Sequence, residues 1–462
     1  MENSIEKEKL NSYIRTLAKS AKALLYKCPV VFFGTVLYLM YVMTVGEKMF
    51  SSKAPFSDAN TRFTSTVLFV AASCISQIMF FAFSSHTSGV MSSPISESFL
   101  YIQGLHCALA KSVPAPKLFS TLFACTALSA MLTSAGFFAL RALRADRAIH
   151  KIPSAASKAL FVSIGILCVF YANDRLENIK VSNVPSWAIS AAFNSVGVCL
   201  TIFCFVCRER APAVPQYSVL WIGVLFTAAF YLCAWACRMS LSSLVSSGWL
   251  LCNPRKPISM KIPSVAFSKI QKQEIVRQLP AIAKISALNL LQFPINFPST
   301  KARTGESTHV RKELLANGLS NAMSMFLGCT TYVLPSSTIA VYEAGSRSKI
   351  DTLLFAGALG LVTITGYKYL FYIPFVVLDL LFLCLGLNII FQSSLSAVQE
   401  GWGTFAFVIF ISLTSVATSS ILWGAVVAGA MYALKHTLKH GFNTFTFTGC
   451  RRPLRARARL PR

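Results

Sequence analysis

The chain has 462 residues, of which 54% are hydrophobic and only 13% are charged, and its mean hydropathy is +0.58. This composition excludes an ordinary soluble domain and indicates one polytopic membrane bundle. Lys and Arg outnumber Asp and Glu by 43 to 17. No basic helix, RNA-binding motif or zinc spacing accompanies this excess, so nucleic acid is not an expected partner, and cytoplasmic loops that face anionic lipid explain the charge better.

The chain begins with a charged, weakly amphipathic stretch that is too long for a signal peptide, and residues 1–29 are therefore predicted to form a basic cytoplasmic N-terminus. Apolar segments then predict an all-α polytopic membrane protein with about 14 transmembrane helices. Their ranges are 30–46, 64–84, 95–110, 119–140, 159–172, 186–206, 217–237, 281–297, 312–329, 332–344, 352–366, 370–392, 404–417 and 419–435. The third and tenth fall short of the roughly 20 residues of a full span and are predicted to be half-helices.

Charge placement predicts how the spans are organised. Most basic clusters fall where an even number of spans with both termini in the cytoplasm would put cytoplasmic loops. The exception is 251–279, predicted to be a basic non-cytoplasmic loop, which divides the chain into a first repeat, 30–250, and a second, 280–436. Residues 437–462 are predicted to be a basic C-terminal tail. Two sets of seven spans must have opposite orientations, which is the inverted-repeat arrangement of secondary transporters, with the half-helices at matching positions.

Polar residues precede both half-helices, in "SSHTSGVMSSPISESF" and in "TTYVLPSSTIAVYEAG". Each stretch is predicted to be a short extended segment that turns into a helix N-terminus with hydroxyls at the cap. Two such termini that meet would present free backbone N–H groups to a solute, which suits an anion or the carboxylate of a zwitterion. The residues predicted to bind the solute are Ser92, Ser93, Ser96, Glu97, Ser336, Ser337 and Thr338. The alternative is that these hydroxyls bond to helix backbone while the prolines make kinks.

Three acidic residues in or near the spans are candidates for coupling to a proton, because a carboxylate is costly inside a membrane. Glu97 follows the first predicted cap within two turns and is the preferred candidate. Glu343 precedes Arg347 and Lys349, so a solvated helix end is the alternative for it. Asp379 lies in "FVVLDLLFLCLGL", where a packing role and a proton-relay role both stay open.

No other pattern predicts chemistry. The fourteen cysteines lie mostly in apolar runs without paired spacing, which is typical of small buried side chains rather than of disulfides or metal ligands. His436 and His440 have i, i+4 spacing but no Glu or Cys partner, so no metal site is expected. Without a nucleophile elbow, an HExxH motif or a kinase set, neither an enzyme nor a cofactor is predicted. Pro294 and Pro298 are predicted to terminate span eight, in preference to a ligand-facing role for Asn296.

The stretch "RKELLANGLSNAMSMFLG", with Glu313, Gly318 and Asn321, followed by a polar break and Gly345, resembles spans nine and ten of the SulP (sulfate permease, solute carrier 26) family. "LQFPINFPS", with Pro294 and Asn296, is similar to an element of its fungal and protist branch. The resemblance covers roughly residues 25–436 and is strongest at 285–350. It implies the uracil-permease-type fold of fourteen spans in two inverted repeats, with a mobile core, a gate domain and a substrate site between the third and tenth helices.

Two departures from the family pattern affect the expected function. Only 26 residues follow His436, too few for the cytoplasmic STAS domain of most members. Ser337 and Thr338 also stand near the start of helix ten, where anion-transporting relatives often have an Arg. The branch it resembles includes vacuolar proteins of basic amino acid storage, so a cationic or zwitterionic solute is an alternative.

The function expected from the sequence is secondary-active transport of an anion, such as sulfate or an organic anion, by an elevator-type movement. A basic amino acid transporter of the same fold and a transport-inactive membrane scaffold are the alternatives. Expected partners are a small solute, membrane lipid and a coupling proton, with homodimerisation left open. The expected location is a vacuolar or other endomembrane rather than the plasma membrane.

Overall fold

The protein is described here by a computed structural model, which covers residues 27–39, 41–42, 59–94, 98–145, 154–173, 186–211, 213–247, 249–250, 266–370, 372–418 and 420–446. A helical segment at Lys27–Leu39 comes first. It is followed by α2 (Ala59–Phe83), β1 (Ser92–Pro94), α3 (Phe99–Ser112), α4 (Ala115–Ala142), α6 (Ser154–Asn173), α7 (Ser186–Arg210), α8 (Ala213–Gln216), α9 (Ser218–Ala236), α10 (Leu241–Ser246), η3 (Phe267–Lys269), α11 (Lys272–Arg277), α12 (Leu279–Thr304), α13 (Val310–Ser324), η4 (Met325–Leu327), β2 (Thr331–Val333), α14 (Pro335–Glu343), α15 (Ile350–Leu370), α16 (Phe375–Glu400), α17 (Trp402–Ala417) and α18 (Ile421–Thr446). Each apolar segment predicted from the sequence overlaps a helix. In the described part of the chain, six helices are long and apolar enough on their own to cross a membrane.

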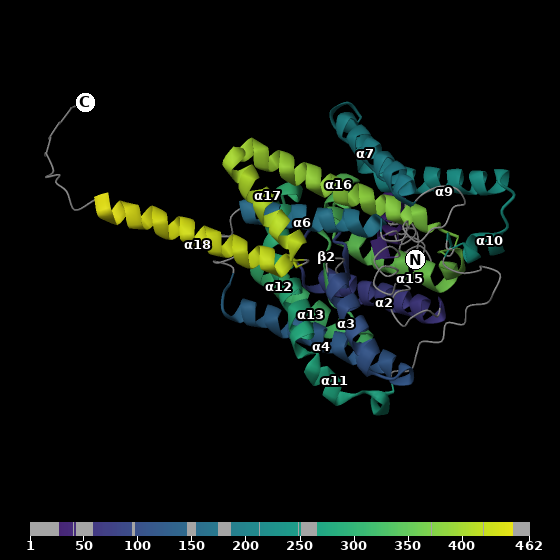
Figure 1. The fold of residues 1–462 in the computed structure, drawn as a ribbon, viewed down its shortest axis with the longest axis horizontal. Helices are drawn as coiled ribbons and strands as arrows, with labels where there is room; N and C mark the ends of the chain where they lie inside the picture. Colours follow the sequence, from purple (N-terminus) through teal and green to yellow (C-terminus); the bar gives the residue numbers. More distant parts are fainter. Residues whose placement is uncertain are drawn as a thin grey trace, which may run out of the picture.

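The helices form two groups, which Figure 1 shows on opposite sides of the molecule. In the first group α13 packs against α2 and α4, α15 against α2, and α12 against α4 and α14. In the second group α16 packs along α6, and α17 and α18 pack against α6 and each other, while α7 and α9 lie against α16. Both strands belong to the first group, because β1 packs on α2 and β2 on α13.

A buried apolar cluster joins the two groups. It contains Leu288 and Ile295 of α12, Ile164 of α6 and Phe382 of α16. Next to it the Tyr101 hydroxyl lies 2.9 Å from the Ser420 hydroxyl, which connects α3 to the start of α18. The first group therefore presents α3 and α12 to the second group.

Helix α12 continues through both of its prolines, so the predicted helix end at Pro294 and Pro298 is wrong. A membrane helix tolerates proline where side chains and neighbouring helices satisfy the backbone groups that proline frees. The Thr300 hydroxyl donates to the carbonyl of Asn296 at 3.0 Å inside this stretch. The helix ends instead at Gly305, whose positive φ of 68° is the usual way to close a helix C-terminus.

One helix crosses a predicted boundary, and two short helices lie inside a predicted loop. Helix α18 runs to Thr446 and so passes the predicted end of the second repeat at residue 436. The described part of the predicted loop 251–279 contains η3 and the short helix α11. The cysteines that the structure describes are all free thiols.

Candidate functional site

The two polar breaks lie side by side, as the sequence predicts, because β1 and β2 pair as antiparallel strands. Ser92 is opposite Val333, and Pro94 is opposite Thr331. The Leu334 N–H extends this pairing by donating to the carbonyl of Met91 at 2.8 Å. We call this pair of strands the ladder. Since α3 follows β1 and α14 follows β2, the two short helices start at opposite ends of the ladder.

The predicted hydroxyl caps are wrong. The N-cap residue of α14 is Leu334, which has no hydroxyl, and Pro335 occupies the first turn. The strand conformation persists to Leu334, so Ser336 and Ser337 come too late in the chain to cap the helix; Ser336 is exposed and Ser337 is buried. At α3 the N-cap residue is Ser98, again without a side-chain capping bond. The predicted site residues Ser96 and Glu97 lie outside the described residues.

Two of the predicted solute ligands use their hydroxyls to hold the ladder. The Ser92 hydroxyl donates to the carbonyl of Tyr332 at 3.1 Å and also bonds to the hydroxyl of Ser76 on α2. Ser76 bonds in turn to Ser320 of α13 at 2.6 Å. Thr338 accepts a bond from the Met91 N–H at 3.1 Å. These hydroxyls join α2, α13 and α14 to the two strands, which is a positioning role.

The motif residues that carry the family resemblance also support the ladder. The carboxamide of Asn321 accepts from the N–H of Thr331 at 3.0 Å and donates to the carbonyl of the same residue at 2.8 Å. It thus takes the place of a third strand at the edge of β2. A Cβ atom on Gly318 would lie 2.8 Å from the Phe138 ring, and the Gly318 carbonyl accepts from Ser134 at 2.8 Å, so this glycine permits the close packing of α13 on α4.

Three fully buried polar side chains surround the face of the ladder that carries Ser93. Ser93 and Gln77 both have 0% exposure. The Tyr38 hydroxyl donates to the carbonyl of Ser92. It also lies beside Ser73, Gln77 and Ser93. Tyr38 and Gln77 were not predicted as site residues, because a single polar residue in a long apolar helix has no local sequence motif that marks it.

Helix α12 carries a row of buried amides. Its first turns share an apolar cluster with Leu105, in the middle of α3, through Ile282 and Ile285. Its last turn meets the end of α14, where Arg303 pairs with Glu343. Helix α12 therefore packs against both short helices. The residues of this row are Asn289, Gln292 and Asn296, which are 0%, 1% and 4% exposed.

The amides of this row differ in their hydrogen bonds. Asn296 donates to the side-chain oxygen of Gln292 at 2.9 Å, whereas its own Oδ1 has no partner among the described residues. Asn289 has no described partner at either Nδ2 or Oδ1. An amide buried without a partner costs roughly 1–3 kcal/mol, so such a group is expected to have a partner that arrives from outside the protein, such as a solute or water.

Beyond the ladder, the loop that joins α2 to β1 holds a buried ionisable cluster. Glu313 accepts bonds from the Ser84 hydroxyl at 2.9 Å and from the Ser85 N–H at 2.6 Å. His86 Nδ1 lies 2.6 Å from Glu306. Burial by itself raises the pKa of Glu306, but hydrogen bonds from His86 and the two following residues outweigh it and lower the pKa to about 2. The sequence singled out Glu313 by its motif but gave no sign of these partners.

The other two predicted coupling residues lie away from the ladder. Glu343 is exposed and pairs with Arg303 at 3.0 Å, which fits the solvated helix end that the sequence left as an alternative. Asp379 is buried on α16, which packs in the second group. Gly345 follows α14 with φ of 107°, a conformation that favours glycine at this turn.

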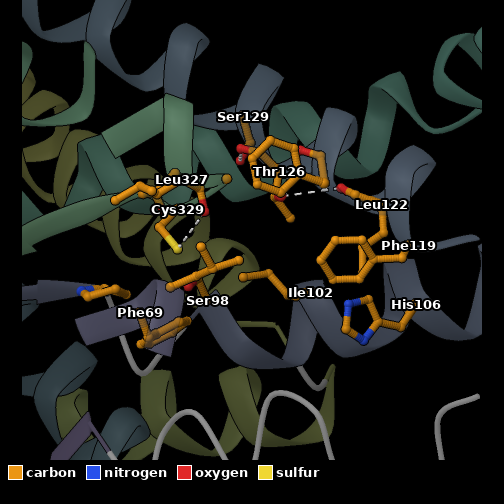
Figure 2. Close-up of a pocket in the computed structure, with 15 residues that line it drawn as sticks. Phe69, Ser98, Ile102, His106, Phe119, Leu122, Thr126, Ser129, Leu327 and Cys329 are labelled. Atoms are coloured by element: carbon orange, nitrogen blue, oxygen red, sulfur yellow. Dashed lines mark hydrogen bonds between the residues drawn. The ribbon is translucent and has the colours of Figure 1, made fainter. Parts of the chain in front are cut away.

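A mostly apolar cavity lies between α2, α3 and α4. Figure 2 shows Ile102 and His106 of α3 facing Phe119 and Leu122 of α4 across it. The cavity reaches the ladder only at Pro94 and at the residue before β2, and neither Ser93 nor Ser337 lines it. In the described part of the chain no three His, Cys, Asp or Glu side chains come together as a metal site.

Comparison with known proteins gives concordant results. Residues 174–414, about half of the chain, match the sequence profile of the Sulfate permease family. The Vacuolar basic amino acid transporter VSB1 of Saccharomyces cerevisiae is 22% identical over 373 residues, which cover 77% of this chain but only 35% of that protein. The chain thus spans about a third of the length of this relative.

Solved structures of membrane transporters share the fold. The transmembrane domain of a cyanobacterium bicarbonate transporter, BicA, superposes with a TM-score of 0.58 at 16% identity, covering 86% of this chain and 96% of that one. The overall structure of SLC26A9 gives a TM-score of 0.60 at 13% identity over 91% of this chain and 70% of that one. Murine Slc26a9 in the inward-facing state gives 0.60 at 14% identity, with 89% and 68% covered. At these identities the likeness concerns the fold alone.

Proposed function

Because the chain belongs to the sulfate permease family, we propose that it is a secondary-active membrane transporter of a small solute that carries an anionic group, such as sulfate or an organic anion. The observation that carries the proposal is the ladder. Two segments, 92–94 and 331–333, break a helical bundle at its buried interior and each leads into a short helix. Irregular backbone at membrane depth is tolerated where it lines a site, and broken helices are where transporters bind their solutes.

The proposed architecture is that of fourteen spans in two inverted repeats of seven, with α3 and α14 as the half-helices. The antiparallel relation of β1 and β2 supports it, since corresponding strands of two oppositely oriented repeats run in opposite directions. In this proposal the first helix group moves as the core of an elevator and the second is the gate. Both termini lie in the cytoplasm, and the membrane is vacuolar or another endomembrane.

The proposed solute site faces the second helix group, between the ladder and α12. Ser337 offers its backbone N–H group and hydroxyl in the first turn of α14, and Ser93 offers its hydroxyl on β1, while Ser92 and Thr338 keep the strands in place. Glu97 and Ser96, which follow β1 directly in the sequence, are proposed as further solute or coupling contacts. Two further acids are weaker coupling candidates. Asp379 lies in the second helix group, and Glu343 is exposed and ion-paired with Arg303.

A basic amino acid is the second candidate solute. VSB1 is named as a transporter of such solutes, and the described residues next to the ladder lack the cationic side chain that a dianion would favour. A transport-inactive scaffold is the third candidate. It predicts a folded, stable protein without flux for any solute of a broad panel.

Flux through purified protein in liposomes tests the proposal. We expect uptake of labelled sulfate or arginine, and we expect S337W to abolish it because the buried Ser337 lies in the first turn of α14. T365W is the matched control, since Thr365 is exposed on α15 and bonds only within its own helix. Competition between arginine and sulfate distinguishes the two solutes. Unaltered flux in folded S337W protein would refute the placement of the site.

A further inference from the structure

The segment that leads from α2 into β1, residues 84–91, is held in place by side chains of other elements. The Ser85 N–H donates to Glu313 of α13 at 2.6 Å, and the Ser88 N–H donates to Glu306, in the turn before α13, at 2.7 Å. The N–H groups of residues 89–91 donate to three hydroxyls, those of Ser346, Thr352 and Thr338. Since the segment forms neither helix nor strand, the position of β1 depends on these acceptors.

His86 lies in this segment between the two carboxylates. Its Nδ1 lies 2.6 Å from Glu306, and its Nε2 lies 4.0 Å from Glu313. His86 is 4% exposed and Glu313 is 1% exposed. The neighbouring Thr87 is exposed, and its hydroxyl donates to Glu306 at 2.8 Å, so these side chains lie just below the protein surface, within reach of protons from water. We call His86, Glu306 and Glu313 the acid–histidine cluster.

A neutral imidazole cannot satisfy both carboxylates of this cluster. It carries one N–H, so one ring nitrogen donates while the other presents a lone pair. With the proton on Nδ1, at hydrogen-bond distance from Glu306, the lone pair of Nε2 faces Glu313. Burial raises the pKa of Glu306, but the bonds that it accepts outweigh burial and lower the pKa to about 2, so this carboxylate stays ionised at neutral pH. A second proton, on Nε2, turns the contact with Glu313 from repulsive into attractive.

The other charged groups around the segment are engaged elsewhere or exposed. Lys349, in the turn after α14, donates to the carbonyl of Ser84 at 2.7 Å. Asp351 of α15 pairs with Lys27 at 2.6 Å. Three exposed side chains lie at the start of α13: His309, Arg311 and Lys312. Histidine is the side chain that ordinarily changes its charge between about pH 5 and 8, and among the described residues His86 is the one that contacts both carboxylates.

We propose that His86 is a proton-binding positioning residue for transport: a proton on its Nε2 completes the acid–histidine cluster, holds residues 84–91 against α13 and thereby fixes β1 at the solute site. This inference rests on the proposed transport function and adds to it a proton site outside the ladder. The proton comes from water and binds to the ring lone pair, so only an N–H bond forms. Because the competent arrangement carries this proton, transport is favoured at low pH and weakens as the pH rises and the proton is lost.

Uptake of labelled sulfate and arginine into liposomes that contain the full chain tests the inference. It is measured from about pH 5 to 8, the range in which histidine ordinarily titrates. The pH is the same on both sides of the membrane, so that no proton gradient drives the flux. Loss of one hydrogen bond to a charged group corresponds to about a tenfold change in affinity, so the KM should rise roughly tenfold across this range.

Two variants separate proton binding from a merely structural role. H86N keeps an amide near the position of Nδ1 but takes up no proton in this range, so it should remove the pH dependence. E313Q removes the charge that faces Nε2, so the midpoint of the pH dependence should move to lower pH. This shift keeps the test decisive if H86N does not fold. H309N is the matched control and should keep the normal pH dependence, since the backbone N–H of His309, rather than its exposed ring, bonds to Ser85.

Hydrogen exchange of peptides that cover residues 84–94, corrected for the intrinsic effect of pH, reports on the segment independently of flux. We expect faster exchange at about pH 8 than at about pH 6 in the unmodified protein, and no such difference in H86N. Uptake without pH dependence, the same pH dependence in folded H86N, or an unchanged midpoint in E313Q would overturn the inference and leave the transport function standing. Absence of flux for every solute of a broad panel would overturn the transport function and, with it, the role of His86 in transport.

Discussion

Replacing Asn321 by leucine tests whether the ladder depends on the carboxamide that closes its edge. In the protein this amide bonds to both the N–H and the carbonyl of Thr331, and it also donates to the carbonyl of Asn317 at 2.8 Å. Leucine has a similarly branched side chain but can make none of these bonds. Thr331 is 0% exposed, so water cannot replace the lost partner without opening the structure.

The expected cost follows from two backbone groups of Thr331 that are left buried and unsatisfied. Each costs about 1–3 kcal/mol, so N321L should lose about 2–6 kcal/mol. This is a large part of the roughly 5–15 kcal/mol that stabilises a typical folded protein. We therefore expect a clearly lower unfolding temperature in detergent and loss of flux in the fraction that stays folded, because β2 leads directly into α14.

Differential scanning fluorimetry and liposome uptake measure these two effects. N388L is the control, because Asn388 lies on α16 and its amide oxygen bonds only to the neighbouring Gln392 at 2.8 Å. If N321L unfolded at the temperature of the unmodified protein and carried solute at the same rate, β2 would not depend on this amide and our account of the ladder would be refuted.

Three further predictions concern the surroundings of the ladder. The pKa of Glu306 is lowered from 4.5 to about 2 in the folded protein, so its bonds stabilise the fold above pH 4.5 and are lost as the pH falls toward 2. Between these pH values the unfolding temperature should drop more steeply in the unmodified protein than in E306Q. Parallel curves of unfolding temperature against pH would contradict this. G318L should lower the free energy of unfolding by about 1–3 kcal/mol, because its side chain collides with Phe138. G357L on α15 is the control, since no atom lies near its Cβ position. Equal unfolding temperatures of the two variants would contradict the close packing of α13 on α4. P294A should keep α12 continuous and leave the unfolding temperature unchanged or higher, as circular dichroism and fluorimetry can check, whereas loss of folded protein would show that the proline is needed.

Hydropathy was sufficient to predict the helical segments, because burial in lipid requires long apolar runs and the chain keeps most of its charge out of them. The break before each short helix was predictable from Ser92, Ser93 and Pro335, and the structure places the two breaks against each other. Their pairing as strands was not predictable, since three residues of ladder have no periodic pattern of their own. The expected helix end at Pro294 was wrong because, in a membrane bundle, side chains and neighbouring helices satisfy the backbone groups that proline frees.

The candidate site was only partly predictable. Residue type correctly marked Ser92 and Thr338 as polar residues at the break, but it could not tell a hydroxyl that holds a strand from one that is free. For Ser92 that distinction depends on its bond to Ser76 of α2. Ser76 bonds in turn to Ser320 of α13, which is far away in the sequence. Gln77 and Asn289 have no local motif, and only their complete burial sets them apart.

Chemical modification of a cysteine at position 93 tests most directly whether the ladder is the place where solute binds. Ser93 is buried on β1, so S93C places a small thiol at the proposed site. The rate at which a small thiol reagent modifies that position in liposomes is measured by peptide mass spectrometry, with the exposed native Cys237, at the end of α9, as an internal reference. We predict that a transported solute slows modification at position 93 and leaves Cys237 unaffected. A solute that is transported by S93C without protecting position 93 would contradict the account.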